Sequence, residues 1–369
     1  MLGGLLFLFS MPFLPHWAFI FLGGYVIIKD YKSLKRMSRN NIFSLSLLLL
    51  YIFACIINML FHSKNQVSFG IPYVLMHLIT FFIALSLNEK DAKVLVYFII
   101  FEAFVGFFEI SIGVSSILPG AESYKLGISQ YWYNNRVTGL YYNSSSHAGV
   151  LFIGLVLFEK FKHQFEYKIA IKIVLLAAIL SSFSRAIIVV TVLLEIMIYY
   201  SVFANSLKSI LNNKLRINKQ QLYLLLFITI IVTIIAVLII ANFDIILKQF
   251  TRGKGTLELS GRPLIWKLSL EFIRNNLLFG NGSFKYFAPI PSGPIHTHNS
   301  YIQLVANHGV VLALIFLIFI FSRVNKQNIL FLLPIFIDSI VETNIFWGIS
   351  LMDIILFAFL FNSNFNKKS

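Results

Sequence analysis

Residues 303–321 have the sequence QLVANHGVVLALIFLIFIF, in which every residue from Val310 to Phe321 is apolar. A transmembrane helix needs about 20 mainly apolar residues, so this stretch predicts a membrane span. Of the 369 residues of the chain, 58% are hydrophobic and only 12% are charged, and the mean hydropathy is +0.82. About a quarter of the residues in a soluble domain are charged. The composition therefore excludes a soluble enzyme and a disordered chain, and it favours a single integral membrane domain over residues 1–369.

Further apolar stretches predict an all-α polytopic membrane protein with about 11–12 transmembrane helices. The candidate spans besides 303–321 are 42–62, 70–87, 94–112, 147–158, 169–183, 186–204, 222–241, 328–342 and 346–362. The stretch 147–158 is the weakest of them. Residues 2–28 contain Pro12 and Pro15, and proline interrupts helices. This first stretch predicts either one tilted helix or a hairpin of two helices, and we favour the hairpin.

The basic residues are unevenly distributed between the loops of this topology. The chain has 30 Lys and Arg against 15 Asp and Glu, a net charge of +15. Most of these cations lie in the loops 29–41, 88–93, 159–168, 205–221 and 322–327 and in the tail after residue 362. Loops rich in Lys and Arg remain in the cytoplasm, so this side is predicted to be cytoplasmic. The excess of base also predicts contact with anionic membrane lipid and not with nucleic acid.

Two long segments, 113–146 and 242–302, are predicted to lie on the opposite, outer side. In the larger outer loop, 242–302, Ser260 can cap a helix and Pro263 fits its first turn. Apolar residues follow with amphipathic spacing at Leu264, Trp266, Leu268, Phe272 and Ile273. This pattern predicts an amphipathic helix over 260–278, which either lies on the membrane surface or packs as a lid on the spans.

Three basic side chains on the predicted outer side have the chemistry that a group-transfer site needs. Arg185 ends the sequence SSFSR, Arg262 lies in SGRP, and His298 lies in HTHNSY. A guanidinium group binds phosphate through a planar set of donors, and it stabilises the charge on a departing diphosphate. A histidine titrates near neutral pH and can accept a proton from a hydroxyl group. The set fits transfer from a lipid-diphosphate donor to a hydroxyl acceptor.

Each of these residues also has an explanation without catalysis. Arg185 can reach lipid headgroups, and Arg262 can pair with a lipid phosphate or with Glu258 on the same helical face. His298 can cap a helix or lie at the membrane interface. Residues 272–337 contain no Cys, Asp or Glu that could complete a metal site with the two histidines of HTHNSY, so no metal is predicted.

Acidic residues in or near the predicted spans leave a further alternative open. Glu102 and Glu109 share one helical face, and the other acids of this kind are Glu195, Asp338, Glu342 and Asp353. A charge at the bilayer centre costs on the order of 3 kcal/mol, so these groups face the protein interior or lie near an interface. They can form an ion path, as in a transporter, or bind neighbouring helices by hydrogen bonds, which we favour. No glycine-rich nucleotide-binding loop is present, so an activated substrate must supply the energy.

The motifs of the larger outer loop resemble those of the O-antigen polymerases and O-antigen ligases. In that family a large periplasmic loop has an arginine, a glycine-rich turn and a His-Asn pair, and nine residues separate the pair from a glycine in the next helix. The corresponding residues here are Arg262, the turn FGNG at 279–282, the pair His298-Asn299 and Gly309. The motifs that carry the resemblance lie within about residues 130–320. The order of apolar stretches and loops resembles that of the family over the whole chain.

Two earlier motifs extend the resemblance towards the amino terminus. Arg185 resembles an arginine motif of the family, and Arg136-Val137-Thr138-Gly139 with Asn143 resembles its "R-x-x-G … N" segment. The ligases have Gly, Thr or Tyr three residues after the conserved glycine, where this chain has Leu312. This difference favours a polymerase.

The resemblance implies a GT-C-like fold and a glycosyltransferase that needs no metal or other cofactor. By position, His298 would be the general base that deprotonates the acceptor hydroxyl. The residues expected to bind the diphosphate or the glycan are Arg136, Arg185, Arg262, Asn299 and Trp266. The donor would be an oligosaccharide linked to undecaprenyl diphosphate, and a chain-length regulator protein is a further expected partner.

The expected reaction is that of a surface-polysaccharide polymerase. It moves the growing glycan from undecaprenyl diphosphate to the non-reducing end of a lipid-linked repeat unit, with inversion at the anomeric carbon. The active site would lie on the periplasmic face of the bacterial inner membrane. An O-antigen ligase, which transfers the glycan to lipid A-core, is the first alternative. A lipid-linked oligosaccharide flippase or an ion-coupled transporter is an alternative of another class.

Overall fold

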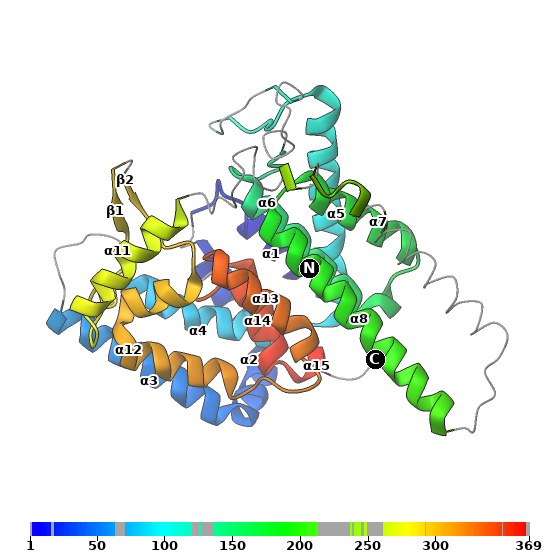
Figure 1. Cartoon of the computed structure of the whole chain (residues 1–369). Helices are drawn as coiled ribbons and strands as arrows, with labels where there is room; N and C mark the ends of the chain where they lie inside the picture. Colours follow the sequence, from blue (N-terminus) through cyan, green and yellow to red (C-terminus); the bar gives the residue numbers. More distant parts are fainter. Residues whose placement is uncertain are drawn as a thin grey trace.

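The computed structural model describes residues 2–15, 18–62, 71–119, 136–212, 261–291, 293–348 and 350–366, with isolated positions between 121 and 126 and between 237 and 248. These residues form a bundle of α-helices with one short hairpin of strands (Figure 1). The predicted all-α class is confirmed. Ser260, Glu258, most of the predicted span 222–241 and much of both outer segments lie outside the described residues.

The helices of the amino-terminal part match the predicted apolar stretches, but α2 continues into the predicted loop 29–41 and α8 continues into the predicted loop 205–221. They are α1 (Leu2–Phe9), α2 (Phe19–Asn40), α3 (Ile42–His62), α4 (Ile71–Ser86), α5 (Glu89–Ile112), α6 (Ser144–Lys160), α7 (Lys168–Ser181) and α8 (Arg185–Asn212), with the 3-10 turn η3 (Lys162–Gln164) after α6. Local sequence sets several of their ends. The side chain of Asn88 caps α5 by accepting a hydrogen bond from the amide of Asp91 at 3.0 Å. Gly113 ends that helix with a φ of +74°, which glycine adopts without strain.

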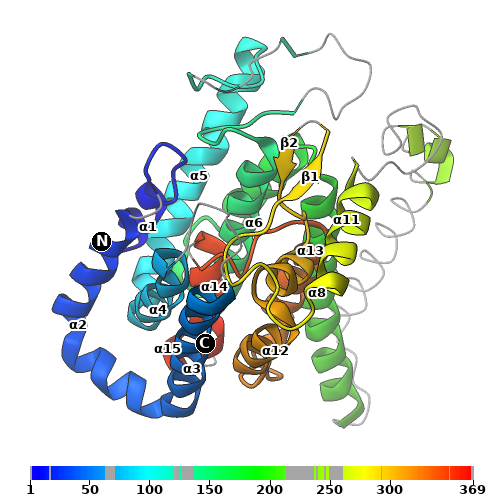
Figure 2. The ribbon, with the colours of Figure 1, turned by 90° about the vertical axis from the view of Figure 1, so that its left-hand side faces the viewer.

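The carboxy-terminal part contains one small antiparallel hairpin of strands. Its elements are α11 (Arg262–Asn275), β1 (Ala288–Ile290), β2 (Gly293–Ile295), α12 (Ser300–Phe321), α13 (Ile329–Val341), α14 (Leu351–Phe361) and α15 (Ser363–Asn366). In the hairpin, Ala288 lies opposite Ile295. Helix α11 packs on α12 and on β1, so the hairpin and α11 form one layer over the amino-terminal end of α12 (Figure 2).

The first apolar stretch is divided into two helices. Pro12 and Pro15 lie between the end of α1 and the start of α2, which agrees with a helix break at the prolines. However, α1 has only 8 residues, and a helix of that length rises about 12 Å. The apolar core of a bilayer is about 30 Å thick. As a straight helix, α1 is therefore too short to be one span of the predicted hairpin, and it packs against α5 instead.

Three helices among the described residues are long and apolar enough to cross a membrane, by length and composition. They are Ile42–Phe61 in α3, Glu89–Ile112 in α5 and Ser300–Phe321 in α12. Shorter apolar helices occur at Tyr73–Ser86, Ile329–Val341 and Leu351–Phe361. These helices are compatible with the predicted polytopic membrane protein.

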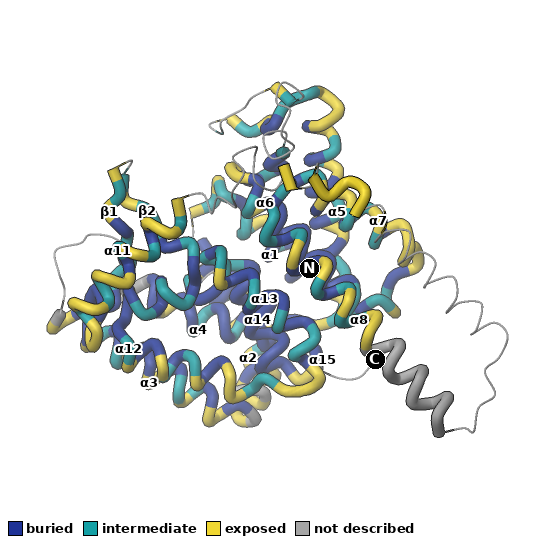
Figure 3. The backbone as a smooth tube through the Cα atoms, in the orientation of Figure 1, coloured by how far each residue is buried: buried dark blue, intermediate teal, exposed yellow. Residues whose placement is uncertain are grey.

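Helix α6, the weakest predicted span, lies in the middle of the bundle. Every residue from His147 to Phe158 is buried, as is every residue of α14 (Figure 3). The neighbours of α6 are α5, α7, α8 and α14. Residues 148–158 are apolar or glycine on every face of the helix, which is typical of a helix that is surrounded by protein.

Glu102 and Glu109 on α5 bind the segment that precedes α6. Glu109 accepts hydrogen bonds from the amide of Gly139 at 2.8 Å and from that of Thr138 at 3.1 Å. Glu102 accepts one from the amide of Leu140 at 3.0 Å, and its other contact is the Nδ1 atom of His147 at 2.6 Å. Both acids therefore have structural partners, which supports the hydrogen-bonding interpretation over an ion path.

Two backbones cross closely where the glycine-rich turn passes over α12. The helix is kinked at Gly309, whose φ is +78° and ψ is 168°, a conformation nearly restricted to glycine. A Cβ atom at this position would lie 2.0 Å from the carbonyl oxygen of Leu278, and one at Gly280 would lie 2.5 Å from the amide nitrogen of Gly309. The amide of Val310 donates to the carbonyl of Leu277 at 2.9 Å. Gly280 and Gly309 thus permit direct contact between the turn and α12.

Replacing Gly309 with alanine should strongly destabilise the protein. Backbone strain and overpacking each cost on the order of 1–3 kcal/mol, so we expect a loss of about 3 kcal/mol in unfolding free energy. Thermal unfolding of the detergent-solubilised chain measures this as a lower apparent Tm.

The matched control is Gly24→Ala in α2, where an added Cβ meets no atom within 4 Å. In a helix this change leaves stability unchanged or increases it, because alanine restricts the unfolded chain. Equal Tm values for Gly309→Ala, Gly24→Ala and the wild type would contradict the proposed role of the crossing.

Candidate functional site

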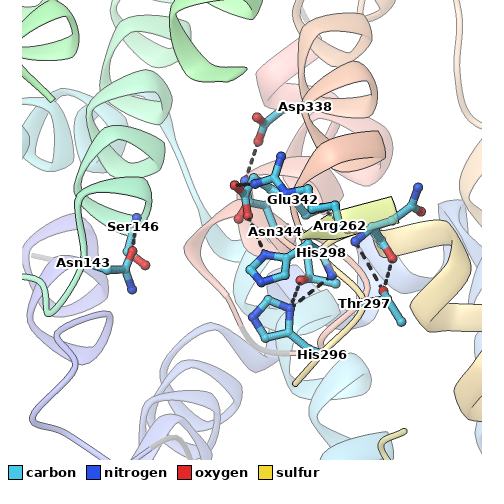
Figure 4. Close-up of polar contacts among 12 residues, drawn as sticks. Asn143, Ser146, Arg262, His296, Thr297, His298, Asp338, Glu342 and Asn344 are labelled. Carbon is cyan, nitrogen blue, oxygen red and sulfur yellow. Dashed lines mark hydrogen bonds and ion pairs between the residues drawn. The ribbon is translucent and has the colours of Figure 1, made fainter. Parts of the chain in front are cut away.

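Arg262 and His298, which are distant in sequence, meet at one carboxylate. Arg262 is the first residue of α11, His298 lies just before α12, and Glu342 follows the last residue of α13. Nη2 of Arg262 donates to Oε1 of Glu342, and Nδ1 of His298 lies 3.4 Å from Oε2 of the same side chain. Figure 4 shows the arginine and the histidine approaching Glu342 from different segments.

The environment of Glu342 keeps this side chain charged. Only 11% of the side chain is exposed, against 17% for Arg262 and 25% for His298. Burial alone would raise the pKa of Glu342, but the hydrogen bond from His298 and the positive charge of Arg262 lower it below its usual value. A carboxylate can only accept, so Nδ1 of His298 donates its proton to Glu342. In the neutral ring Nε2 is then the acceptor, the form that a general base needs.

A tight turn holds His298 in an uncommon backbone conformation. Its φ is +50°, in the left-handed region that non-glycine residues seldom adopt. The neighbouring Thr297 stabilises the turn, because its amide donates to Oε1 of Gln303 at 2.9 Å and its hydroxyl donates to the carbonyl of Asn299 at 2.7 Å. The indole N–H of Trp266 donates to the carbonyl of Thr297 at 2.9 Å. Trp266 therefore links α11 to the turn that presents His298.

The side chain of Asn299 acts as the amino-terminal cap of α12. Its Oδ1 atom accepts hydrogen bonds from the amides of Tyr301 and Ile302, both at 2.9 Å. Asn299 thereby satisfies two donors that the first turn of a helix leaves unpaired. This contact gives the residue after His298 a structural role, while the substrate-binding roles expected for Asn299 and Trp266 remain predictions.

His296 lies beside His298 and extends the polar network. The centres of the two rings are 4.1 Å apart. Nδ1 of His296 accepts a hydrogen bond from the amide of His298 at 3.3 Å, and the hydroxyl of Thr343 lies 2.6 Å from the same atom. Burial, and next the electrostatic effect of the neighbouring His298, lower the pKa of His296 to about 4. His296 is therefore neutral at physiological pH. In the described part of the chain, no three His, Cys, Asp or Glu side chains are arranged to hold a metal ion.

A large cavity adjoins this network. Its volume is about 830 Å³, and its walls come from the turn after α1, from α4, α6 and α14, and from the segment 343–352. Thr343, the partner of His296, lies in its wall, and so does Trp347, whose ring centre is 6.0 Å from that of His296. Asn143 and Ser146 at the start of α6 lie opposite the histidines in Figure 4, and Ser146 lines the cavity. Two residues of the cavity wall, Thr343 and Trp347, therefore lie beside His296.

The other two arginines predicted for the site occupy neighbouring elements. Arg185 is the first residue of α8, which packs against α13, and Arg136 precedes the segment bound by Glu102 and Glu109. Both side chains are half-buried. Within the described residues, the contacts that join Arg262 to His298 pass through Glu342 and involve neither Arg136 nor Arg185. Their expected roles in diphosphate binding remain predictions.

Two residues of the network were not predicted as site residues from the sequence. From the sequence, Glu342 is expected to hydrogen-bond a neighbouring helix or to form part of an ion path. Thr343 lies in no motif that the sequence analysis identifies. The relevant signal was topological, because the predicted span 328–342 ends on the same side of the membrane on which 303–321 begins. That placement indicates proximity to His298, but it does not identify the partner.

Part of the chain matches a known protein family, and no curated protein matches the chain. Residues 170–317 match the model of the family described as O-antigen ligase, and the matched region contains Arg185, Arg262, Trp266, His298 and Asn299. Members of this family are glycosyltransferase-like enzymes that ligate or polymerise O-antigen, and the family together with the apolar helices supports a multi-pass membrane protein. The match over residues 170–317 thus confirms the resemblance of this chain to the O-antigen polymerase and ligase family.

Proposed function

We propose that the protein is an O-antigen polymerase with His298 as its general base. The observation that supports this proposal is the shared contact of Arg262 and His298 with Glu342. It brings a phosphate-binding group and a proton acceptor together at one end of the helical bundle. In this proposal the donor is a glycan on undecaprenyl diphosphate and the acceptor is a lipid-linked repeat unit at the periplasmic face of the inner membrane.

His298 removes the proton of the acceptor sugar hydroxyl. Glu342 accepts a hydrogen bond from the Nδ1–H of the ring, orients the imidazole and stabilises the imidazolium that forms. The acceptor oxygen attacks the anomeric carbon of the donor glycan while the bond from that carbon to the diphosphate oxygen breaks. The attack comes from the face opposite the leaving group and inverts the configuration. The proton ends on Nε2 of His298 and passes to solvent after transfer.

Arg262 binds the diphosphate and stabilises the charge that develops as it leaves. A guanidinium group has five N–H donors. In the described contacts, Nη2 of Arg262 donates to Glu342. The other donors of the fork suit a phosphate oxygen, and Glu342 holds the guanidinium group in place before the substrate arrives. Arg185 and Arg136 are proposed as further contacts of the diphosphate and glycan.

Replacing His298 with alanine should reduce the rate of chain extension by about 10²–10⁴-fold, the usual contribution of a general base. The measurement is in vitro polymerisation of lipid-linked repeat units by the purified protein. The matched control is His163→Ala, at a histidine whose side chain is 43% exposed and contacts Glu89. Near-normal polymerisation by His298→Ala, or an equal loss in His163→Ala, would exclude His298 as the base.

A double substitution separates substrate binding by Arg262 from its support of Glu342. We expect Arg262→Ala to reduce kcat/KM about tenfold or more relative to the wild type. We expect a similar reduction when Arg262→Ala is added to Glu342→Gln, because a charge-assisted contact to phosphate is lost in each comparison. If Arg262 only positions Glu342, the double variant will be as active as Glu342→Gln alone. Arg274→Ala, at an exposed arginine in the last turn of α11, is the matched control.

The lipid profile of a strain that lacks the gene distinguishes the two enzymes of this family. Loss of a polymerase leaves single repeat units attached to the lipid A-core, because ligation continues without chain extension. Loss of a ligase instead leaves the core bare, while lipid-linked polymer accumulates. We expect the first profile on a lipopolysaccharide gel, and the second would replace the polymerase assignment with the ligase.

A further inference from the structure

Lys285 is the only charged residue among the described residues that line the 830 Å³ cavity. Much of the wall is apolar and includes Phe9, Phe19, Met76, Val150, Ile153 and Met352. The wall also has polar groups, such as Thr343 and Asn344. A cavity whose wall combines one cation with many apolar side chains is complementary to an anionic amphiphile.

Two aromatic rings hold the ammonium group of Lys285 at the cavity wall. Its Nζ atom lies 3.7 Å from the centre of the Trp347 ring and 4.6 Å from that of the Tyr73 ring, and both rings also line the cavity. Such cation–π contacts stabilise a charge that is partly removed from water. Burial lowers the pKa of Lys285 to about 7, and the nearby Asp353 opposes this effect. An incoming phosphate would favour the charged form.

The backbone beside Lys285 is fixed to α12. The amide of Ser283 donates to the carbonyl of Asn307 at 2.9 Å, and the amide of Tyr286 donates to Oδ1 of the same asparagine at 2.8 Å. Gln303 donates to the carbonyl of Tyr286 at 2.8 Å, and its Oε1 accepts the amide of Thr297. One helix therefore positions both Lys285 and the turn that contains His298.

We infer that Lys285 is a further phosphate-binding residue, and that the cavity holds the polyprenyl chain of the donor next to it. This inference rests on the proposed function, because it places the donor lipid beside His296 and His298. Lys285 leaves the face of Trp347 to contact a phosphate oxygen, while the first isoprene units lie against the apolar wall. Lys285 acts in positioning the substrate and does not exchange a proton with the sugar.

The test is binding of undecaprenyl phosphate to the full-length protein in detergent. We expect Lys285→Met to bind this lipid about tenfold or more weakly than the wild type, and Lys285→Arg to recover most of the loss because it restores a cation. Both proteins should bind uncharged undecaprenol equally, because the apolar wall is unchanged. In the polymerisation assay, Lys285→Met should raise KM for the donor with a smaller effect on kcat.

The control is Lys267→Met, at an exposed lysine on α11. Equal affinity of the wild type and Lys285→Met for undecaprenyl phosphate would overturn the inference. So would an equal loss in Lys267→Met, or a loss of undecaprenol binding that matches the loss for the phosphate. Competition by phosphatidylglycerol as strong as that by undecaprenyl phosphate would show a general lipid site and also overturn it.

Polymerisation by the His298→Ala protein, compared with the lipid titration of Lys285→Met, separates this inference from the proposed function. If His298→Ala polymerises normally while Lys285→Met binds undecaprenyl phosphate weakly, the proposed base is wrong and the lipid site stands. If His298→Ala is inactive while Lys285→Met binds normally, the lipid site is wrong and the proposed base stands.

Discussion

The backbone contact between the glycine-rich turn and α12 is the constraint on which the candidate site depends. Leu278 and Gly280 approach Gly309 so closely that no Cβ atom fits between the chains. The contact fixes where α11 ends and where the segment leading to β1 begins, both relative to α12. Arg262 is the first residue of α11 and His298 lies just before α12, so the contact also helps to set the separation of these two residues.

Glu342 completes the site from a different part of the chain. The family match ends at residue 317 and includes the arginine and the histidine, but their common partner follows α13. The position of the carboxylate therefore depends on the packing of α13 against α8 and α12. A further contact supports this arrangement, because the hydroxyl of Ser300 donates to the backbone carbonyl of Glu342 at 3.1 Å.

Much of the fold was predictable because lipid demands long apolar helices. The stretches 42–62 and 303–321 correspond to α3 and α12, and the prolines divide the first apolar stretch as expected. The motifs also identified Arg262 and His298, which the structure brings together. Glu342 could not be assigned as their partner, because apolar patterning locates helices and does not determine which ends meet. The cavity depends on side chains from separate helices, and no local pattern encodes such an arrangement.

The burial of α6 has a consequence for how the protein is assembled in the cell. This helix has 17 residues, and its first turn contains serines and a histidine, so its own transfer from the translocon into lipid is weakly favoured. Its burial by α5, α7, α8 and α14 means that the groups that stabilise it arrive partly after it during synthesis. Stable integration of α6 is therefore a late event that is coupled to helix association, and biogenesis of the bundle is cooperative.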